Sequence, residues 1–173
     1  KSKFNASIFR EYDIRGVASK DLSEEFSETL GLAYAQLIKG RSPNTDRKKL
    51  TVAVGKDCRL SSDSYETSLV NGLLKGGLDV IRLGPCPTPL TYFSLFHLDL
   101  DGGIMITASH NPPDQNGFKV CVGHDTIYGS QIQELRSIME NNPKPNQQTG
   151  VVSDYDIISA YIGYHQKHTS PFQ

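Results

Sequence analysis

Residues 102–120 read GGIMITASHNPPDQNGFKV, an apolar run, then a polar segment with two prolines, then a second apolar run. The first run predicts a buried strand over 103–107, and the second predicts a strand over 117–122. Parallel neighbours need a crossover of a dozen or more residues, and the gap between these strands is shorter. The two strands are therefore expected to be antiparallel, joined by a stiff polar loop that displays Ser109 and His110.

Helices and strands are predicted to alternate along the rest of the chain. Several segments have apolar residues at helical spacing, and short apolar runs lie between them. The predicted helices cover 23–39, 62–75, 90–98, 129–141 and 153–167, and the remaining strands cover 50–54 and 78–83. This order predicts an α/β fold in which a mixed, mostly parallel sheet of about four strands is sandwiched between helices.

The overall composition limits the possible classes of function. The 173 residues carry 18 Lys+Arg and 19 Asp+Glu, and this formal net charge of −1 lacks the basic surplus of a general nucleic-acid binder. No apolar stretch reaches the roughly 20 residues of a membrane helix, so no membrane partner is expected. The three cysteines are odd in number, and no two of them have C-x-x-C spacing. We therefore expect reduced thiols in a cytoplasmic compartment.

The chain is predicted to hold one folded domain followed by a linker. Residues 1–141 contain every predicted strand and form the domain, whereas 142–150, NPKPNQQTG, have the composition of a linker. Residues 151–173 contain the last predicted helix, which is expected to belong to another structural unit.

Three polar turns stand where an open α/β sheet gathers ligands, beyond the carboxyl ends of its strands. They cover 10–16, 55–59 and 109–112. Together with the returning strand they place four basic side chains around the hydroxyl of Ser109, namely Arg15, Arg59, His110 and Lys119. Arginine forks and lysine point charges suit phosphoryl oxygens, so this set predicts a site that stabilises a phosphorylated serine.

The same residues allow other interpretations. Ser109 next to His110 suggests a serine hydrolase, but adjacent residues of an extended loop point apart and no G-x-S-x-G motif occurs. The turn 99–102 suggests a metal loop, but it lacks the other ligands of a calcium loop, which favours a plain turn. For Arg59 the structural alternative is a helix cap or a pair with Asp57. Nucleotide binding has no support, since neither a Walker A nor a G-x-G-x-x-G sequence is present.

Several short motifs occur in a fixed order along the chain. They are Phe9–Gly16 (FREYDIRG), Gly55-x-Asp57-x-Arg59, Thr88-Pro89, Thr107–Pro112 (TASHNP) and Asn116-Gly117-x-Lys119. In this combination they resemble the α-D-phosphohexomutase superfamily, and the resemblance extends from residue 8 to residue 165. The first motif is most similar to the N-terminal domain of the phosphomannomutase/phosphoglucomutase branch, because the phosphoglucosamine branch usually has a Gly-Thr-Asp-Gly turn there.

The resemblance implies an activity and a role for each site residue. Members of the family have four domains around a central cleft and interconvert hexose 1- and 6-phosphates, here of mannose, glucose or both, through a bisphosphorylated sugar. By resemblance, Ser109 carries the phosphoryl group, and Mg²⁺ binds through its phosphate with most metal ligands on a second domain. The resemblance assigns proton handling and charge stabilisation to Arg15 and Lys119, and support of the loop to His110. It assigns substrate binding to Tyr12, Arg15 and Arg59.

The family's Asp-Gly-Asp-x-Asp-Arg metal loop does not occur in this sequence. The chain is therefore expected to be domain one of a longer phosphohexomutase, with 151–173 beginning the connection to a second domain, and to show no turnover alone. Its expected partners are a hexose phosphate and the remaining domains of the same enzyme. The alternative is a non-catalytic sugar-phosphate-binding or regulatory protein that uses this domain alone.

Overall fold

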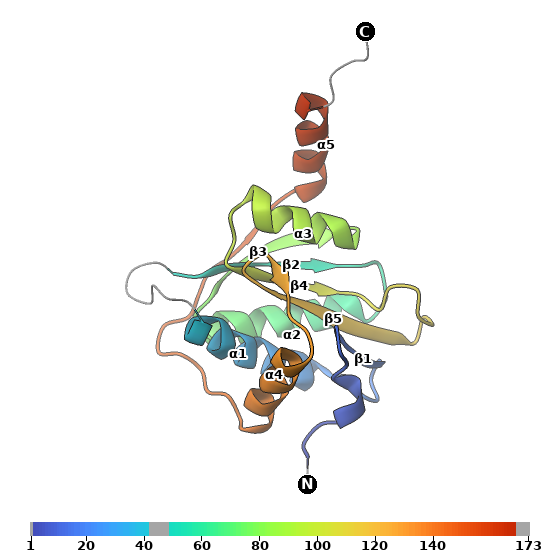
Figure 1. The fold of residues 1–173 in the computed structure, drawn as a ribbon, viewed down its shortest axis with the longest axis vertical. Helices are drawn as coiled ribbons and strands as arrows, with labels where there is room; N and C mark the ends of the chain where they lie inside the picture. The colour runs from blue at the N-terminus through green and yellow to red at the C-terminus, as the bar shows by residue number, and fades with distance from the viewer. Residues whose placement is uncertain (1, 42–48, 169–173) are drawn as a thin grey trace.

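A mixed β-sheet forms the middle layer of the fold, as seen in a computed structural model that describes residues 2–41 and 49–168 (Figure 1). Within those residues the sheet has seven strands, in the order β1-β5-β4-β2-β3-β7, with β6 paired to β5. The strands are β1 (Ile14–Val17), β2 (Thr51–Lys56), β3 (Asp79–Pro85), β4 (Gly102–Ile106), β5 (Gln115–Val122), β6 (Asp125–Thr126) and β7 (Val152–Asp154). β2 is parallel to β3 and β4, β7 is parallel to β3, and β5 is antiparallel to β1, β4 and β6.

The sheet confirms the predicted fold class and corrects the number of strands. The four predicted strands correspond to β2, β3, β4 and β5, and β4 and β5 are antiparallel neighbours as expected. The sequence patterns did not predict β1, β6 or β7, because these strands are only 4, 2 and 3 residues long and show no periodicity of their own. The helix expected from residue 153 begins only at Ile157, since the residues before it form β7.

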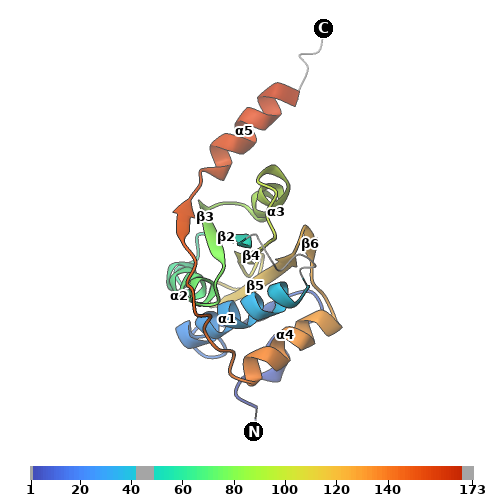
Figure 2. The same cartoon turned by 90° about the vertical axis from the view of Figure 1, so that its left-hand side faces the viewer.

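Helices cover both faces of the sheet (Figures 1 and 2). α1 (Glu24–Arg41), α2 (Ser62–Lys75) and α4 (Ser130–Glu140) lie on one face, and α3 (Thr88–His97) lies on the other. A short 3-10 helix, Ala6–Ile8, precedes β1. α5 (Ile157–His168) contacts α3 and extends away from the sheet (Figure 2). None of the helices in the described ranges is long and apolar enough to cross a membrane.

Successive side chains of β5 point to opposite faces of the sheet, and this decides which face carries Lys119. Phe118 and Val120 belong to the larger hydrophobic core, which includes residues of α1, α2 and α4, whereas Cys121 packs in the smaller core with residues of α3. Because successive strand residues point to opposite faces, Lys119 lies on the α3 face of the sheet. Its side chain is 24% exposed, so the charged end of this residue reaches the surface on that face.

The predicted linker 142–150 has no regular secondary structure, but it is attached to the end of α2. The N–H of Asn146 donates to the carbonyl oxygen of Lys75, and the N–H of Gly150 donates to that of Leu74. These bonds lead the chain to β7 at the edge of the sheet. The division into a domain, a linker and a connection to a further unit stays a prediction. Residues 169–173 of the predicted connection lie outside the described residues.

Gly72 lets helices α1 and α2 pack closely. A Cβ atom on Gly72 would lie 2.1 Å from the carbonyl oxygen of Glu28 in α1, and one on Gly31 would lie 2.6 Å from that of Leu69 in α2. We expect Gly72→Ala to lower the free energy of unfolding of this chain by up to about 2 kcal/mol, because an overpacking cost of about 1–3 kcal/mol is offset in part by a gain of about 1 kcal/mol in helix propensity.

Thermal or urea unfolding followed by circular dichroism measures this effect. The matched control is Gly40→Ala in α1, where a Cβ atom meets nothing within 4 Å and stability is expected to be unchanged or slightly higher. A Gly72→Ala variant at least as stable as the original chain would show that the two helices can separate without cost.

Candidate active site

The predicted polar turns meet at one edge of the sheet. Strand register places Lys56, the last residue of β2, beside Ile106, the last residue of β4. Arg15 in β1 lies opposite Gly117 in β5, and Gly117 accepts a hydrogen bond from the N–H of Thr107. The loop from 107 to 114 that carries Ser109 therefore begins and ends between β1 and β2. This is the edge at which an open α/β sheet is expected to bind ligands.

Ser109 is exposed in a turn with an unusual backbone conformation. Its φ is 56°, in the left-handed region, which costs a residue with a side chain of order 1–3 kcal/mol and persists only where the surroundings enforce it. Its N–H donates to Thr107 Oγ1 at 3.0 Å, and the N–H of Asn111 donates to the carbonyl oxygen of Ala108 at 3.2 Å. Ser109 Oγ has no hydrogen-bond partner among the residues that the structure describes. The loop thus presents an unpaired hydroxyl in a fixed backbone.

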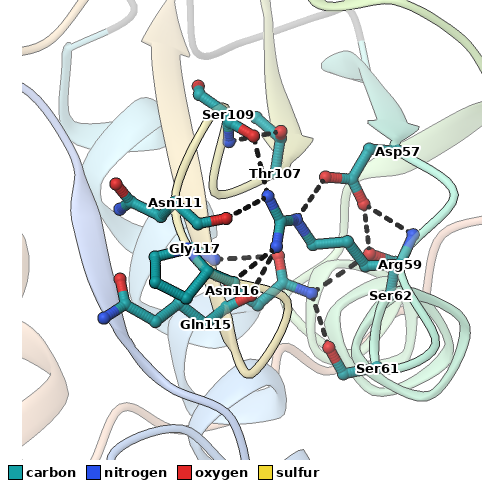
Figure 3. Close-up of polar contacts among 11 residues, drawn as sticks. Asp57, Arg59, Ser61, Ser62, Thr107, Ser109, Asn111, Gln115, Asn116 and Gly117 are labelled. Carbon is teal, nitrogen blue, oxygen red and sulfur yellow. Dashed lines mark hydrogen bonds and ion pairs between the residues drawn. The ribbon is translucent and has the colours of Figure 1, made fainter.

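The guanidinium of Arg59 lies beneath this loop (Figure 3). Its Nε donates to Asp57 Oδ2 at 3.1 Å, which agrees with the alternative that Arg59 pairs with Asp57. Its two terminal nitrogens donate to the backbone carbonyl oxygens of Ser109, Asn111 and Pro112 in the loop, at 2.7, 3.0 and 2.9 Å, and to that of Gln115 at the start of β5, at 3.4 Å. All of the donor nitrogens are directed at the protein, so the predicted substrate-binding role of Arg59 gains no support from this geometry and stays a prediction.

A second charged cluster lies around Asp13, which is only 8% exposed. Arg15 Nη2 donates to Asp13 Oδ2 at 2.7 Å, and Lys119 Nζ lies 3.9 Å from the same oxygen. One carboxylate thus holds two cations, which leaves an excess of positive charge. Arg15 Nε is buried and has no hydrogen-bond partner among the described residues, so this guanidinium keeps an unused donor. An anion at this edge of the sheet is the complementary ligand.

Tyr12 and His110 are not brought into contact with the Ser109 hydroxyl. The side chain of Tyr12 is 69% exposed, and His110 is exposed in the turn itself. Neither side chain has a hydrogen bond or an ion pair with the described part of the chain. Both are free to meet a ligand, and their predicted roles in substrate binding and catalysis stay predictions.

Lys56 lies next to this site in sequence but does not face it. Its ammonium contacts Asp63 at 2.8 Å and the mostly buried Glu66 at 3.2 Å, both in α2. Burial alone would lower the pKa of Lys56, but the hydrogen bonds and charges of Asp63 and Glu66 outweigh it and raise the pKa. This lysine therefore stays charged at neutral pH and neutralises acidic groups of α2.

Sequence reasoning gave no role to Asn116 or Ser62, which the structure connects to the loop. Asn116 is fully buried, and its Nδ2 donates to Ser61 Oγ at 2.8 Å and Ser62 Oγ at 3.1 Å. Ser62 Oγ in turn donates to Asp57 Oδ1 at 2.7 Å. In the sequence, Asn116 is visible only as a polar residue between two predicted apolar strands. That it is buried and bonded to Ser62, 54 positions away, depends on the folded structure and could not be predicted from that position alone.

The described residues alone do not make a metal site. They contain no group of three or more His, Cys, Asp or Glu side chains that could hold an ion. Asp101, in the turn that suggested a metal loop, accepts the backbone N–H of Thr51 at 2.9 Å instead. Phosphoryl oxygens are hard ligands of the kind that Mg²⁺ prefers, so a phosphate on Ser109 fits one position of the expected magnesium site. The other ligands would come from outside these residues.

Comparison with known proteins gives consistent matches along most of the chain. Residues 6–146 match the model of the phosphoglucomutase/phosphomannomutase family's alpha/beta/alpha domain I. A phosphomannomutase/phosphoglucomutase of Pseudomonas aeruginosa is 40% identical over 157 residues, which are 91% of this chain and 32% of that protein. A phosphoglucomutase of Neisseria meningitidis is 36% identical over 162 residues, 93% of this chain and 34% of that protein.

A solved structure shares the fold. A phosphoglucomutase/phosphomannomutase family protein from Burkholderia thailandensis superposes with a TM-score of 0.87 at 31% sequence identity. The match covers 98% of this chain and 37% of that one. The chain therefore spans about a third of the length of the relatives that it matches.

Proposed function

This chain belongs to the phosphoglucomutase/phosphomannomutase family, and from that membership we propose that it is the phosphoryl-carrying first domain of a phosphohexomutase. In this proposal Ser109 is the phosphorylated residue, and the longer protein interconverts the 1- and 6-phosphates of glucose, mannose or both. The observation that carries the proposal is the unpaired hydroxyl of Ser109, held in a left-handed turn at the edge of the sheet where Asp13 also gathers the cations Arg15 and Lys119.

The proposed chemistry consists of two phosphoryl transfers. In the first, the free hydroxyl of a hexose monophosphate attacks the phosphorus of phosphorylated Ser109. The new sugar O–P bond forms while the Ser109 O–P bond breaks, the sugar hydroxyl proton is released to a base, and Ser109 Oγ takes up a proton. In the second, Ser109 Oγ attacks the other phosphorus of the bisphosphorylated sugar: the new Ser109 O–P bond forms while that sugar O–P bond breaks, Ser109 gives up its proton, and the freed sugar oxygen takes one up. Each transfer depends on in-line positioning and on stabilisation of the charge on the phosphoryl oxygens.

The residues of this domain supply positioning and charge in that scheme. Arg15, with its unused buried Nε–H, and Lys119 are proposed to stabilise the phosphoryl oxygens and to assist proton transfer. The exposed side chains of Tyr12 and His110 are proposed to meet the sugar and to support the turn. When bound through the Ser109 phosphate, Mg²⁺ would neutralise charge on the transferring group. Most of its ligands are proposed to lie on a second domain, towards which 151–173 would lead.

Turnover of the full-length protein tests this proposal. With Mg²⁺ and a trace of hexose 1,6-bisphosphate, we expect conversion of glucose 1-phosphate, mannose 1-phosphate or both to the 6-phosphates. Removing Mg²⁺ with a chelator should stop the reaction, and the 173-residue chain alone should show none. If the full-length protein binds hexose phosphates but never converts them, the non-catalytic alternative holds instead.

A further inference from the structure

We propose that Arg59 is a positioning residue that locks the Ser109 loop in one conformation, and that Asp57, Ser62 and Asn116 hold Arg59 in place. We call these four residues the Arg59 clamp. The inference rests on the proposed function and deepens it, because it names the groups that keep the phosphoryl carrier in its reactive position.

The contacts of Arg59 span the whole loop. Its terminal nitrogens bind the carbonyl oxygens of Ser109 and Asn111 on the first side of the loop and those of Pro112 and Gln115 on the second side. Two consecutive prolines, at 112 and 113, supply no N–H, so the loop cannot form a regular internal hydrogen-bond pattern. A single planar guanidinium therefore replaces the missing backbone bonds and draws the two sides together (Figure 3).

The other members of the clamp hold the guanidinium through its Nε, which does not face the four carbonyl oxygens. Asp57 accepts both the backbone N–H and the Nε–H of Arg59, each at 3.1 Å, and also the hydroxyl of Ser62 at 2.7 Å. Ser62 is fully buried at the start of α2, and Asn116 binds it from the start of β5. The clamp thus joins the residues after β2, the start of α2 and the start of β5 in one network (Figure 3).

The direction of the carbonyl groups has an electrostatic consequence. Four oxygens that carry partial negative charge accept hydrogen bonds from a permanently charged guanidinium, which offsets their charge beneath the exposed Ser109 side chain. A phosphate on Ser109 carries about −1.5 to −2 charges and would be repelled by carbonyl oxygens that faced it. The clamp consequently prepares the loop for a dianion before the substrate arrives, which is the form of preorganisation that aids charge stabilisation.

The test compares Arg59→Lys with Arg41→Lys in the full-length protein. Both changes keep the charge and lose the guanidinium fork, but Arg41 lies at the end of α1, where its partner among the described residues is Glu134 of α4. For Arg59→Lys we expect kcat to fall about 100-fold, the size of effect that a small misplacement of a reacting group produces, with little change in KM. Amide hydrogen exchange in 108–116 should become faster, whereas Arg41→Lys should leave the loop and kcat as they are.

A double variant distinguishes a clamp from two separate structural effects. If Asp57 acts through Arg59, Asp57→Asn should lower kcat in the original protein but add little to Arg59→Lys. Multiplicative losses in the double variant would overturn the inference, and so would loop exchange in Arg59→Lys that matches Arg41→Lys. Should Arg59→Lys not fold, Ser62→Ala provides the same comparison with a smaller effect. Because loop exchange is read without substrate, it tests the clamp even if the protein proves to have no mutase activity.

Discussion

Replacing Ser109 with alanine is expected to lower the hexose phosphate turnover of the full-length protein by several orders of magnitude while its fold stays intact. The proposed route passes the phosphoryl group through Ser109 Oγ, and removing a covalent nucleophile abolishes the two-step route that it provides. The positive cluster of Arg15 and Lys119 remains in the variant, so binding of the sugar phosphate should largely persist. Loss of kcat without a similar loss of affinity is the expected pattern.

The stability of this variant is expected to change little. Ser109 is exposed and its hydroxyl has no hydrogen-bond partner in the described part of the chain, so its removal opens no core cavity and leaves no buried group unpaired. Ser64→Ala is the matched control, since Ser64 is also exposed and lies in α2. A Ser109→Ala protein within about tenfold of the original kcat, roughly 1.4 kcal/mol in barrier, would mean that Ser109 is not the obligatory carrier.

Removing the charge of Arg15 is expected to have the next largest effect. Arg15→Gln keeps an amide donor for Asp13 but removes the cation and its unused Nε–H. If that donor stabilises phosphoryl oxygens in the transition state, kcat/KM should fall by about 100- to 1,000-fold, the usual effect of losing one preorganised donor. Steady-state kinetics with the two hexose 1-phosphates measures the loss.

Arg41→Gln is the control for this variant, because it also breaks an arginine–carboxylate pair but lies at the end of α1. Its kinetics should match the original protein. The melting temperatures of both variants show whether any loss in Arg15→Gln comes from unfolding. A folded Arg15→Gln protein with unchanged kcat/KM would remove Arg15 from the proposed catalytic roles.

The elements that the sequence predicted well are those with a strong local pattern. β2–β5 have apolar runs, and α1 and α2 have apolar residues at helical spacing. In such segments the local sequence alone indicates which residues are buried. β1 and β7 have no such pattern, because their positions depend on pairing with β5 and β3, which lie far away in the chain. Tertiary pairing, and not local propensity, makes these short segments into strands.

The candidate site shows the same division. The turn that displays Ser109 could be predicted, because it follows an apolar strand and polar turns gather at the strand ends along one edge of a sheet. That Arg15, His110 and Lys119 surround the Ser109 hydroxyl stays a prediction. The sequence could not show that Asp13 holds Arg15 and Lys119 together. Nor could it show that the donors of Arg59 are directed at backbone carbonyls, because such contacts depend on the exact path of the loop.

Transfer of the phosphate from Ser109 in a single turnover tests the central proposal most directly. Full-length protein phosphorylated on the peptide that contains Ser109, as measured by mass spectrometry, is mixed with a hexose 1-phosphate and quenched at increasing times. Our account predicts that phosphate leaves this peptide while an equal amount of hexose bisphosphate appears with the same time course. If the phosphate on Ser109 is labelled with ¹⁸O at the start, hexose 6-phosphate that carries none of this label, or that forms in a protein that never carries phosphate on Ser109, would contradict it. Ser109 that is phosphorylated again after the second transfer would not.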